Sequence, residues 1–354
     1  MEDSRPIQPT TGENPFLSRP AGDFMEQILA AAREASPAAV DGSAESNPAD
    51  AEPAALPCDI APRELPPGTQ LRGYRLLRCI GQGGFGVTYL AEEPQLSRKV
   101  VIKENFPSGI CYRQEGTHHV CLHHPEQDAE GFEWAMNNFL REVRLLGTVD
   151  HPSIAKVYSY FEAYGTSYYV LEYINGVSLG KLAESYAQAG QRLPQASLFG
   201  MLVRLLDALD YLHARKLLHR DIKPDNILIT RTGLPVLIDF GAAREEYGDL
   251  GNTVVESPGF SPSEQGSAAG NMGPWTDLYA LGATLYYILT GECLPSCRQR
   301  ELYDTADPLS LNPALAGEYC REFLQTIERA IVPAPEARYQ SAAEWLADLA
   351  RLPF

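Results

Sequence analysis

The residues best suited to chemistry lie in one short stretch, His219-Arg220-Asp221-Ile222-Lys223-Pro224-Asp225-Asn226. It holds a carboxylate at Asp221 that can accept a proton, a cation at Lys223 and an amide oxygen at Asn226. A second carboxylate, Asp239, follows an apolar strand-like run and begins the triplet Asp-Phe-Gly. Each carboxylate alone would be an ordinary surface charge, but their order and spacing make chance a poor explanation.

A glycine-rich stretch, Gly81-Gln82-Gly83-Gly84-Phe85-Gly86, lies between two strand-like runs. Backbone N–H groups approach phosphates closely where no Cβ obstructs the oxygens. In a dinucleotide-binding unit such glycines open a helix, whereas Val87 to Ala91 is typical of a second strand. Farther on, an apolar strand ends in Lys103, from which a lysine can reach nucleotide phosphates. Alone, Lys103 would be interpreted as an ordinary strand end.

Together these motifs resemble the protein kinase family, and the chain is similar to its bacterial, Hanks-type Ser/Thr-specific members. The stretch from His219 to Asn226 resembles the family's catalytic loop, and Lys223 two residues after Asp221 resembles the Ser/Thr-specific form. Asp239 stands at the metal-binding position of that family. The match covers residues 71–354 and implies an α+β bilobal fold, with a small β-rich N-lobe (about 71–174) containing one regulatory helix and a larger helical C-lobe (about 175–354).

The resemblance implies a role for each matched position. Asp221, Lys223 and Asn226 are the expected catalytic residues, and Asn226 and Asp239 are expected to bind Mg²⁺ through oxygen. Lys103, held by Glu142, would place its charge on the α- and β-phosphates of ATP. The expected ATP-binding residues are Gly81, Gln82, Gly83, Gly84, Phe85, Gly86, Thr88, Val101, Lys103, Glu142, Leu171, Glu172, Ile174 and Asp239, where Leu171 is gatekeeper-like and Glu172 and Ile174 form the hinge that bonds adenine.

The segment from Asp239 to Glu264 matches an activation loop. A phosphate on Thr253 would pair with Arg220 and order the segment, which makes both residues regulatory hypotheses. Ser257 is expected beside Asp221 and Lys223, at the acceptor site. Two further positions match the family: Asp277 would brace the catalytic loop, and Arg338 would pair with Glu264.

The span from Lys103 to Glu142 is longer than the family normally shows. It holds a set of possible metal ligands, namely Cys111, His118, His119, Cys121, His123 and His124. A zinc site is one interpretation, but the usual paired cysteine spacing is absent, so a solvated insertion loop is favoured. Cys293 and Cys297 are likewise interpreted as loop cysteines rather than as metal ligands or a redox pair.

Hydrophobic periodicity predicts the elements that position these residues. Strands are predicted at Tyr74 to Ile80, Val87 to Ala91, Lys99 to Lys103, Ala155 to Phe161 and Ser167 to Tyr173. One helix among them has Met136, Phe139, Val143 and Leu146 on a shared face. Later helices are predicted at Ser197 to Ala214, Asp277 to Leu289, Cys320 to Ala330 and Ala342 to Leu349.

The composition limits the classes of partner. The chain has 354 residues, 44% of them hydrophobic, and a net charge of −17, which disfavours general binding to nucleic acid or anionic membranes. No apolar run is long enough to span a bilayer, and seven scattered cysteines favour a reducing, cytoplasmic setting.

Residues 1–70 contain four arginines and twelve acidic residues, a local net charge of −8, and are interpreted as a disordered tail. A transient helix is possible from Asp23 to Ala35. We hypothesise that this acidic tail competes for the protein's own basic-substrate groove.

The expected function is therefore an ATP-dependent protein serine/threonine kinase that uses ATP and Mg²⁺. Its expected partners are protein substrates and a second copy of itself for autophosphorylation in trans. Two alternatives remain: a pseudokinase scaffold that binds nucleotide without turnover, and a small-molecule kinase of similar fold.

Overall fold

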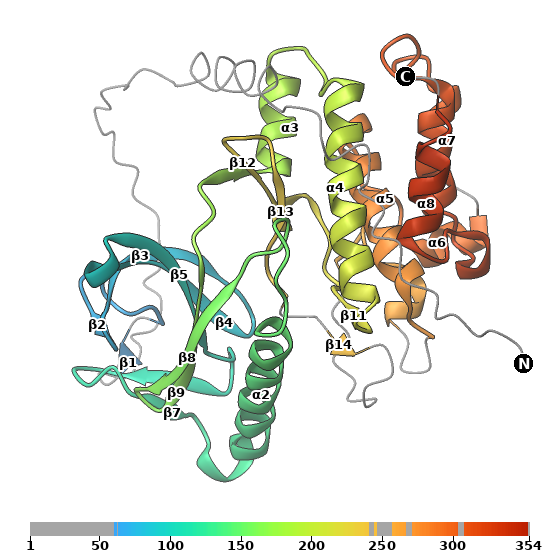
Figure 1. The fold of residues 1–354 in the computed structure, drawn as a ribbon. Helices are drawn as coiled ribbons and strands as arrows, with labels where there is room; N and C mark the ends of the chain where they lie inside the picture. Colours follow the sequence, from blue (N-terminus) through green and yellow to red (C-terminus); the bar gives the residue numbers. More distant parts are fainter. Residues whose placement is uncertain are drawn as a thin grey trace, which may run out of the picture.

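Six antiparallel strands form the sheet of the N-lobe, in the order β2-β3-β4-β5-β9-β8 (Figure 1). The structure is a computed structural model that describes residues 60–61, 63–240, 244–245, 257–266, 271–303 and 308–352. The strands are β2 (Gln70–Leu71), β3 (Tyr74–Gln82), β4 (Gly86–Glu93), β5 (Arg98–Asn105), β8 (Val157–Ala163) and β9 (Thr166–Glu172). Val100 and Ile102 of β5 are fully buried in the N-lobe core. Strand alternation therefore directs Lys103 to the opposite face of the sheet.

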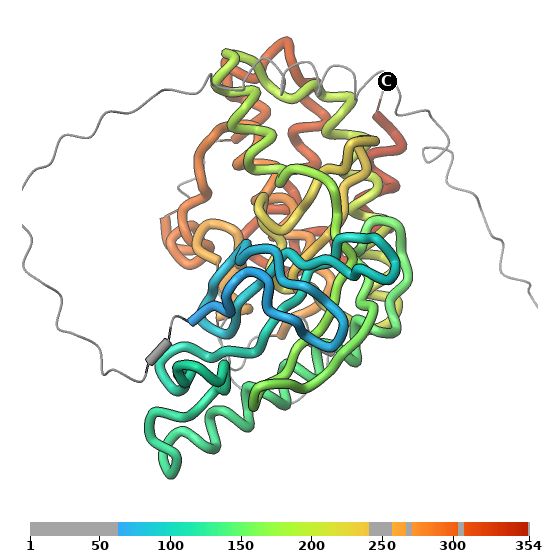
Figure 2. Tube along the Cα trace, turned by 90° about the vertical axis from the view of Figure 1, so that its left-hand side faces the viewer, coloured from blue at the N-terminus to red at the C-terminus, as the bar shows by residue number. Residues whose placement is uncertain are grey.

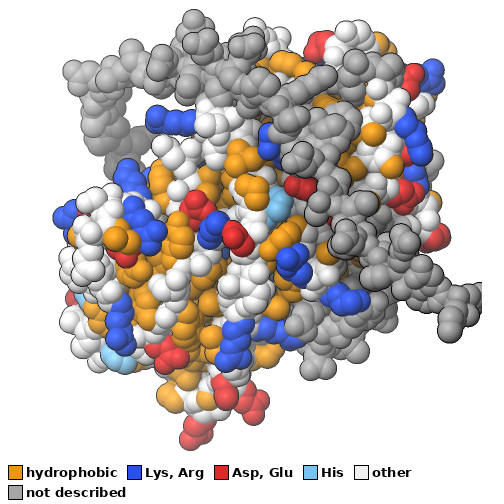
Figure 3. Space-filling model, viewed as in Figure 1, with side chains coloured by type: hydrophobic (Ala, Val, Ile, Leu, Met, Phe, Trp, Pro, Cys, Tyr) orange, Lys and Arg blue, Asp and Glu red, His pale blue; other side chains and the backbone are white. Residues whose placement is uncertain are grey.

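Helix α2 (Pro125–Leu146) packs against this sheet (Figure 1). It is the helix that the sequence predicts between the strands, but it begins well before the predicted apolar face. Proline occupies its first turn, where a missing N–H costs nothing, together with Glu126 and Asp128, whose charges favour a helix N-terminus. Acidic side chains gather on the surface at this end of α2 (Figure 3). The other end buries Glu142, Val143 and Leu146.

The insertion after β5 is folded, so the prediction of a solvated loop is wrong. It forms the hairpin of β6 (Cys111–Gln114) and β7 (Val120–Leu122), and β6 also pairs with β1 (Ile60–Ala61). The hairpin is anchored by Arg113, which is 1% exposed and whose Nη2 donates to both carboxylate oxygens of Glu104 at 2.7 and 2.8 Å. A buried ion pair of this kind replaces the apolar pattern by which a strand is normally recognised in a sequence.

The histidines and cysteines of the insertion do not assemble into a metal site. His118 packs edge-on to Tyr164, and His123 packs against Tyr112. Burial raises the pKa of the Cys111 thiol to about 12, which disfavours the thiolate that zinc binds. Across the ranges given above, no group of three or more His, Cys, Asp or Glu side chains is arranged to hold a metal ion.

The ordered N-lobe begins earlier than the predicted boundary at residue 70. Leu65 is 2% exposed and Leu71 is 1% exposed, and both belong to the core of the sheet. The Gly68 N–H donates to the Leu76 carbonyl at 2.8 Å, which fastens this segment to β3. The stretch contains too many Pro, Gly and Thr residues to show strand periodicity, so its two buried leucines were the only signal. Residues 1–59, including the predicted helix from Asp23 to Ala35, lie outside the described residues.

The C-lobe is helical, and Figure 2 shows its helices gathered at one end of the molecule with the strands of the N-lobe at the other. Its helices are α3 (Leu179–Gln188), α4 (Gln195–His213), α5 (Pro274–Thr290), α6 (Cys297–Tyr303), α7 (Arg321–Ala330) and α8 (Ala342–Leu349). Most residues of α5 are buried, and the helix packs against α4 and α7. The predicted α+β class with two lobes is confirmed. None of the helices in the described ranges combines the length and the apolar character needed to cross a bilayer.

Short strands of the C-lobe carry the loops of the site. β10 (Gly176–Ser178), β12 (Ile227–Thr230) and β13 (Pro235–Leu237) form one small sheet, and β11 (Leu217–Leu218) pairs with β14 (Arg244–Glu245). The loop between β11 and β12 contains Asp221, and the residues after β13 lead to Asp239. The Ile238 N–H donates to the Asn226 carbonyl at 2.9 Å, so the two loops lie side by side.

Candidate active site

Asp221 accepts hydrogen bonds from three neighbouring side chains. Lys223 Nζ lies 3.0 and 2.8 Å from its two carboxylate oxygens, and Asn226 Nδ2 donates to Oδ2 at 2.8 Å. Ser257 Oγ donates to Oδ1 at 2.7 Å and accepts from Lys223 Nζ at 3.3 Å. The structure therefore brings together Asp221, Lys223, Asn226 and Ser257, and it holds a serine hydroxyl between a carboxylate and an ammonium group.

Asp277 of α5 holds the catalytic loop by its backbone. This fully buried carboxylate accepts from the N–H groups of His219 and Arg220 at 2.9 and 2.8 Å, and it lies 2.9 Å from His213 Nε2. Burial alone would raise the pKa of Asp277, but the hydrogen bond and charge of His213 hold it below its usual value. The bracing role predicted for Asp277 matches this geometry.

The backbone is left-handed at two residues of the site, Arg220 (φ 67°) and Asp239 (φ 62°). For side chains other than glycine such a conformation costs about 1–3 kcal/mol and persists only where its surroundings fix it. Arg220 is fixed on both sides, because Asp277 accepts its N–H and Gln265 Nε2 donates to its carbonyl at 2.6 Å. Nearby, the His219 ring packs on Phe240 with 4.3 Å between ring centroids. These contacts organise the loop in advance of any ligand.

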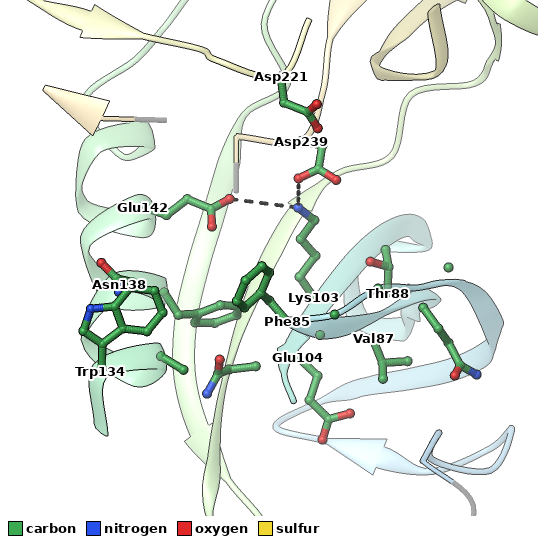
Figure 4. A pocket seen from close by; sticks show the side chains of 18 residues that line it. Phe85, Val87, Thr88, Lys103, Glu104, Trp134, Asn138, Glu142, Asp221 and Asp239 are labelled. Atoms are coloured by element: carbon green, nitrogen blue, oxygen red, sulfur yellow. Dashed lines mark hydrogen bonds and ion pairs between the residues drawn. The ribbon is translucent and has the colours of Figure 1, made fainter. Parts of the chain in front are cut away.

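Lys103 contacts two carboxylates, as Figure 4 shows. Its Nζ forms a close ion pair with Asp239 Oδ1 and lies 4.0 Å from Glu142 Oε1. The sequence predicts Glu142 as the residue that holds Lys103, whereas Asp239 is the nearer partner. Burial would lower the pKa of Lys103, but the charges of Asp239 and Glu142 outweigh it and raise the pKa above its usual value.

Glu142 has a second partner that the sequence did not indicate. Tyr169 of β9 donates its hydroxyl to Glu142 Oε1 at 2.6 Å. Burial and the charge of Glu142 raise the pKa of Tyr169 well above its usual value, so the hydroxyl stays protonated and remains a donor. Residues Thr166 to Leu171 of β9 are all buried, so the hydroxyl of Tyr169 needs a partner inside the protein.

A cavity of about 350 Å³ lies between the glycine-rich hairpin, β5 and α2. All six residues of Gly81–Gly86 line it, with Thr88 beside them, and Lys103, Asp221 and Asp239 also lie along its wall. In Figure 4, Phe85 comes from the hairpin side, while Trp134 and Asn138 come from α2. Gly86 must lack a side chain, since a Cβ there would lie 2.3 Å from the Glu104 carbonyl oxygen.

The residues predicted to contact adenine lie beside this cavity rather than along it. Val101 of β5 is opposite Leu171 of β9 in the sheet register, and Leu171 is 9% exposed. Glu172 ends β9, with its N–H donating to the Lys156 carbonyl at 2.8 Å, and Ile174 follows in the connection to the C-lobe. These residues therefore lie on β5, on β9 and in the connection that follows β9, close to Lys103. Their role in binding adenine stays a prediction.

Glu264 and Arg338 form a buried ion pair in the C-lobe, in the way that the sequence predicts. Arg338 Nη1 and Nη2 lie 2.7 and 3.3 Å from the two oxygens of Glu264, and Arg338 is 1% exposed. Thr276 at the start of α5 donates to the same carboxylate at 3.2 Å. The pair connects the segment after Ser257 to the stretch between α7 and α8, and Thr276 connects the same carboxylate to α5. Thr253, the predicted phosphorylation position, lies outside the described residues.

The arrangement of Lys103, Glu142, Asp221 and Asp239 agrees with a comparison of the sequence with known protein families. Residues 74–339 match the family model described as "Protein kinase domain". The chain belongs to the protein kinase family. The kinase fold also accounts for the two lobes and for the position of the cavity at the glycine-rich hairpin.

Several relatives of this kinase are bacterial. It is 34% identical over 290 residues to the serine/threonine-protein kinase PknA of Nostoc sp. strain PCC 7120, covering 77% of this chain and 46% of that protein. It is 28% identical to PrkC of Bacillus subtilis, covering 80% of this chain and 41% of PrkC. A solved structure described as the apo form of PpkA-294 has 34% identity and a TM-score of 0.71, covering 81% of this chain and 100% of that one. The chain spans about half the length of the first curated relatives it matches.

Proposed function

We propose that this protein is an ATP-dependent protein serine/threonine kinase that transfers the γ-phosphoryl group of ATP to Ser and Thr hydroxyls of proteins. The observation that carries the proposal is the Ser257 hydroxyl, which donates to Asp221 at 2.7 Å and accepts from Lys223 at 3.3 Å. A substrate hydroxyl at the same place would meet a proton acceptor and a cation at once. The names of the bacterial relatives support the same chemistry.

In this mechanism the acceptor oxygen attacks the γ-phosphorus, and the bond from that phosphorus to the bridging oxygen of ADP breaks. The hydroxyl proton passes to Asp221, whose second oxygen is fixed by Asn226. Lys223 offsets the negative charge on the transferred group. Lys103, on the cavity wall, supplies a fixed positive charge for the other phosphates.

The donor set fits Mg²⁺, because Asn226 and Asp239 offer amide and carboxylate oxygens and lie on adjoining loops. When bound there, Mg²⁺ supplies positive charge to the phosphate oxygens. The Asn226 amide nitrogen donates to the carbonyl and to the carboxylate of Asp221, so the amide oxygen of Asn226 points away from that carboxylate. Asp239 stays on the cavity wall beside Lys103.

The proposal extends to regulation and setting. Phosphorylation of Thr253 by a second copy of the kinase would place a dianion near Arg220 and order the loop that follows Asp239. The expected partners are protein substrates. The cysteines among the described residues are free thiols, which supports action in a reducing compartment such as the cytoplasm.

Incubation with labelled ATP and Mg²⁺ tests the function. The wild type is expected to label itself or a protein substrate on Ser or Thr, mapped by mass spectrometry, whereas Asp221→Ala is expected to lose about a hundredfold or more in rate. Asp210→Ala, an exposed carboxylate on α4, is the matched control. Nucleotide binding without transfer by the wild type would favour the pseudokinase, and label found only in small molecules would favour the small-molecule kinase.

A further inference from the structure

Arg63 contacts the glycine-rich hairpin although it precedes the part of the chain that the family model matches. Its Nη2 donates to the Gly83 carbonyl at 2.6 Å and to the Phe106 carbonyl at 2.7 Å. One guanidinium nitrogen thus joins the tip of the hairpin to the residue that follows β5. Its neighbour Glu64 accepts a hydrogen bond from Gln82 of the same hairpin.

The backbone of Arg63 is itself fixed by the insertion. Arg113 donates to the Arg63 carbonyl from Nε at 3.1 Å and from Nη2 at 2.9 Å. Arg113 is in turn held by Glu104, whose carboxylate also accepts from the hydroxyls of Tyr89 and Tyr168 at 2.6 and 2.5 Å. Glu104, Arg113, Tyr89 and Tyr168 are all buried, so the backbone position from which the half-buried Arg63 reaches the hairpin is rigid.

The tip of the hairpin has little packing of its own. A Cβ built on Gly83 or Gly84 would meet nothing within 4 Å, and Phe85 is 57% exposed. The position of the tip therefore depends on hydrogen bonds. Besides Arg63, these come from Ser108, whose N–H donates to the Gly84 carbonyl at 2.7 Å, and from Phe106, whose N–H donates to the Phe85 carbonyl at 3.0 Å.

We propose that Arg63 is a positioning residue for nucleotide binding. It holds the tip of the glycine-rich hairpin in a fixed position over the part of the cavity that would bind the phosphates. It does not touch the reacting atoms; it acts through the Gly83 carbonyl. The segment before the family domain and the insertion after β5 are in this way parts of the nucleotide site. The inference rests on the proposed function for its assignment of ATP as the ligand.

The test compares Arg63→Ala with Arg63→Lys and with Arg78→Ala, an exposed arginine on β3, all in the full chain. In Arg63→Ala the KM for ATP is expected to rise about tenfold while kcat at saturating ATP changes by less than about twofold, because charge-assisted hydrogen bonds that order the free hairpin are lost. The bond from Arg113 to the backbone carbonyl survives the substitution. Arg63→Lys retains a cation but not the planar guanidinium, so its KM for ATP is expected to lie between those of the wild type and Arg63→Ala. The KM of Arg78→Ala is expected to match that of the wild type.

An unchanged KM for ATP in Arg63→Ala would overturn the proposal, and so would a fall in kcat at unchanged KM. Calorimetric titration with ADP keeps the test independent of turnover: weaker binding by Arg63→Ala, with the melting temperature unchanged, supports the inference even if the wild type transfers no phosphate. Equal ADP affinity in wild type and Arg63→Ala overturns it. Absence of transfer by the wild type would count against the proposed function alone.

Discussion

His219 stands at the centre of the site without touching the acceptor position. It is fully buried, its ring packs on Phe240, and its Nδ1 accepts from the Asp221 N–H at 3.3 Å. Burial lowers the pKa of His219 below its usual value, and the nearby carboxylates of Asp277, Asp221 and Asp239 do not reverse this. The folded protein therefore keeps this imidazole neutral, and the unfolded chain takes up a proton at a higher pH.

The sign of the linkage predicts lower stability in acid. As pH falls through about 6.5, the unfolded state gains a proton that the folded state does not, and His219 contributes a loss of at most about 1.4 kcal/mol per pH unit. Urea unfolding at several pH values between about 7.5 and 5.5 measures this slope in the wild type and in His219→Phe. The variant is expected to lose less stability on acidification. Parallel pH profiles would show that the imidazole is not the group responsible.

At the residue scale, the sequence was a better guide to which residue types the site contains than to which side chains contact each other. The order and spacing of Asp221, Lys223, Asn226 and Asp239 supported the resemblance to the protein kinase family, which the family match confirms, because a loop motif fixes the local spacing of its own side chains. The nearer partner of Lys103 depends on how the two lobes meet, and no local pattern records that. Tyr169 was missed for the same reason, since its partner Glu142 lies on a different element.

At the scale of elements, the ion pair between Glu264 and Arg338 connects the segment after the acceptor site to the core of the C-lobe. The Arg338 guanidinium also donates to the carbonyls of Val332 and Pro333 at 2.6 and 2.5 Å. Removing the carboxylate alone leaves a buried cation without its counter-charge. We therefore expect Glu264→Ala to lower the free energy of unfolding by about 3–5 kcal/mol.

A double-mutant cycle checks this prediction. Arg338→Met is expected to be destabilising as well, but the double variant Glu264→Ala with Arg338→Met should lose clearly less stability than the sum of the two. Urea unfolding followed by circular dichroism gives all four values. Additive losses would mean that the two groups do not interact in solution.

The elements themselves were predicted unevenly. The strands β3, β4, β5, β8 and β9 and the helices α4, α5, α7 and α8 occur close to their predicted positions, because long apolar periodic runs are strong signals. The β6–β7 hairpin was missed, since its strands have only four and three residues and its anchor, Arg113, resembles a surface residue until Glu104 is placed beside it. Helix α3 had no prediction either.

At the scale of the whole molecule, the described fold begins well before Tyr74, where the family match starts. Leu65 belongs to the core of the N-lobe, and Arg63 to the contacts of the hairpin. Deletion of residues 1–69 is expected to lower the melting temperature by about 5 °C or more, because a buried leucine is worth about 2–5 kcal/mol. Deletion of residues 1–59 leaves both residues in place and is expected to keep the melting temperature. Leu65→Ala in the full chain is the matched point variant, and scanning calorimetry compares all three.

The shorter deletion also isolates the acidic stretch. Residues 1–59 contain eleven acidic residues and three arginines, so they carry the whole local charge of −8. If this stretch competes for the substrate groove, its removal raises the rate of phosphorylation of a basic protein substrate. Addition of salt is then expected to reduce the difference in rate between the full chain and the deletion variant. An unchanged rate would contradict the competition hypothesis.

The buried cluster around Glu104 also has a consequence for the order in which the chain can fold during synthesis. Glu104 accepts from Tyr89, Arg113 and Tyr168, and Arg113 donates to the Arg63 carbonyl, so the ribosome delivers the first of these residues long before the last. Until β9 has emerged, the Arg113 and Glu104 charges lack the surroundings that bury them, and the N-lobe cannot close around them. We therefore expect the amino-terminal lobe of this kinase not to fold strand by strand as it emerges, but to close only after Tyr168 is available.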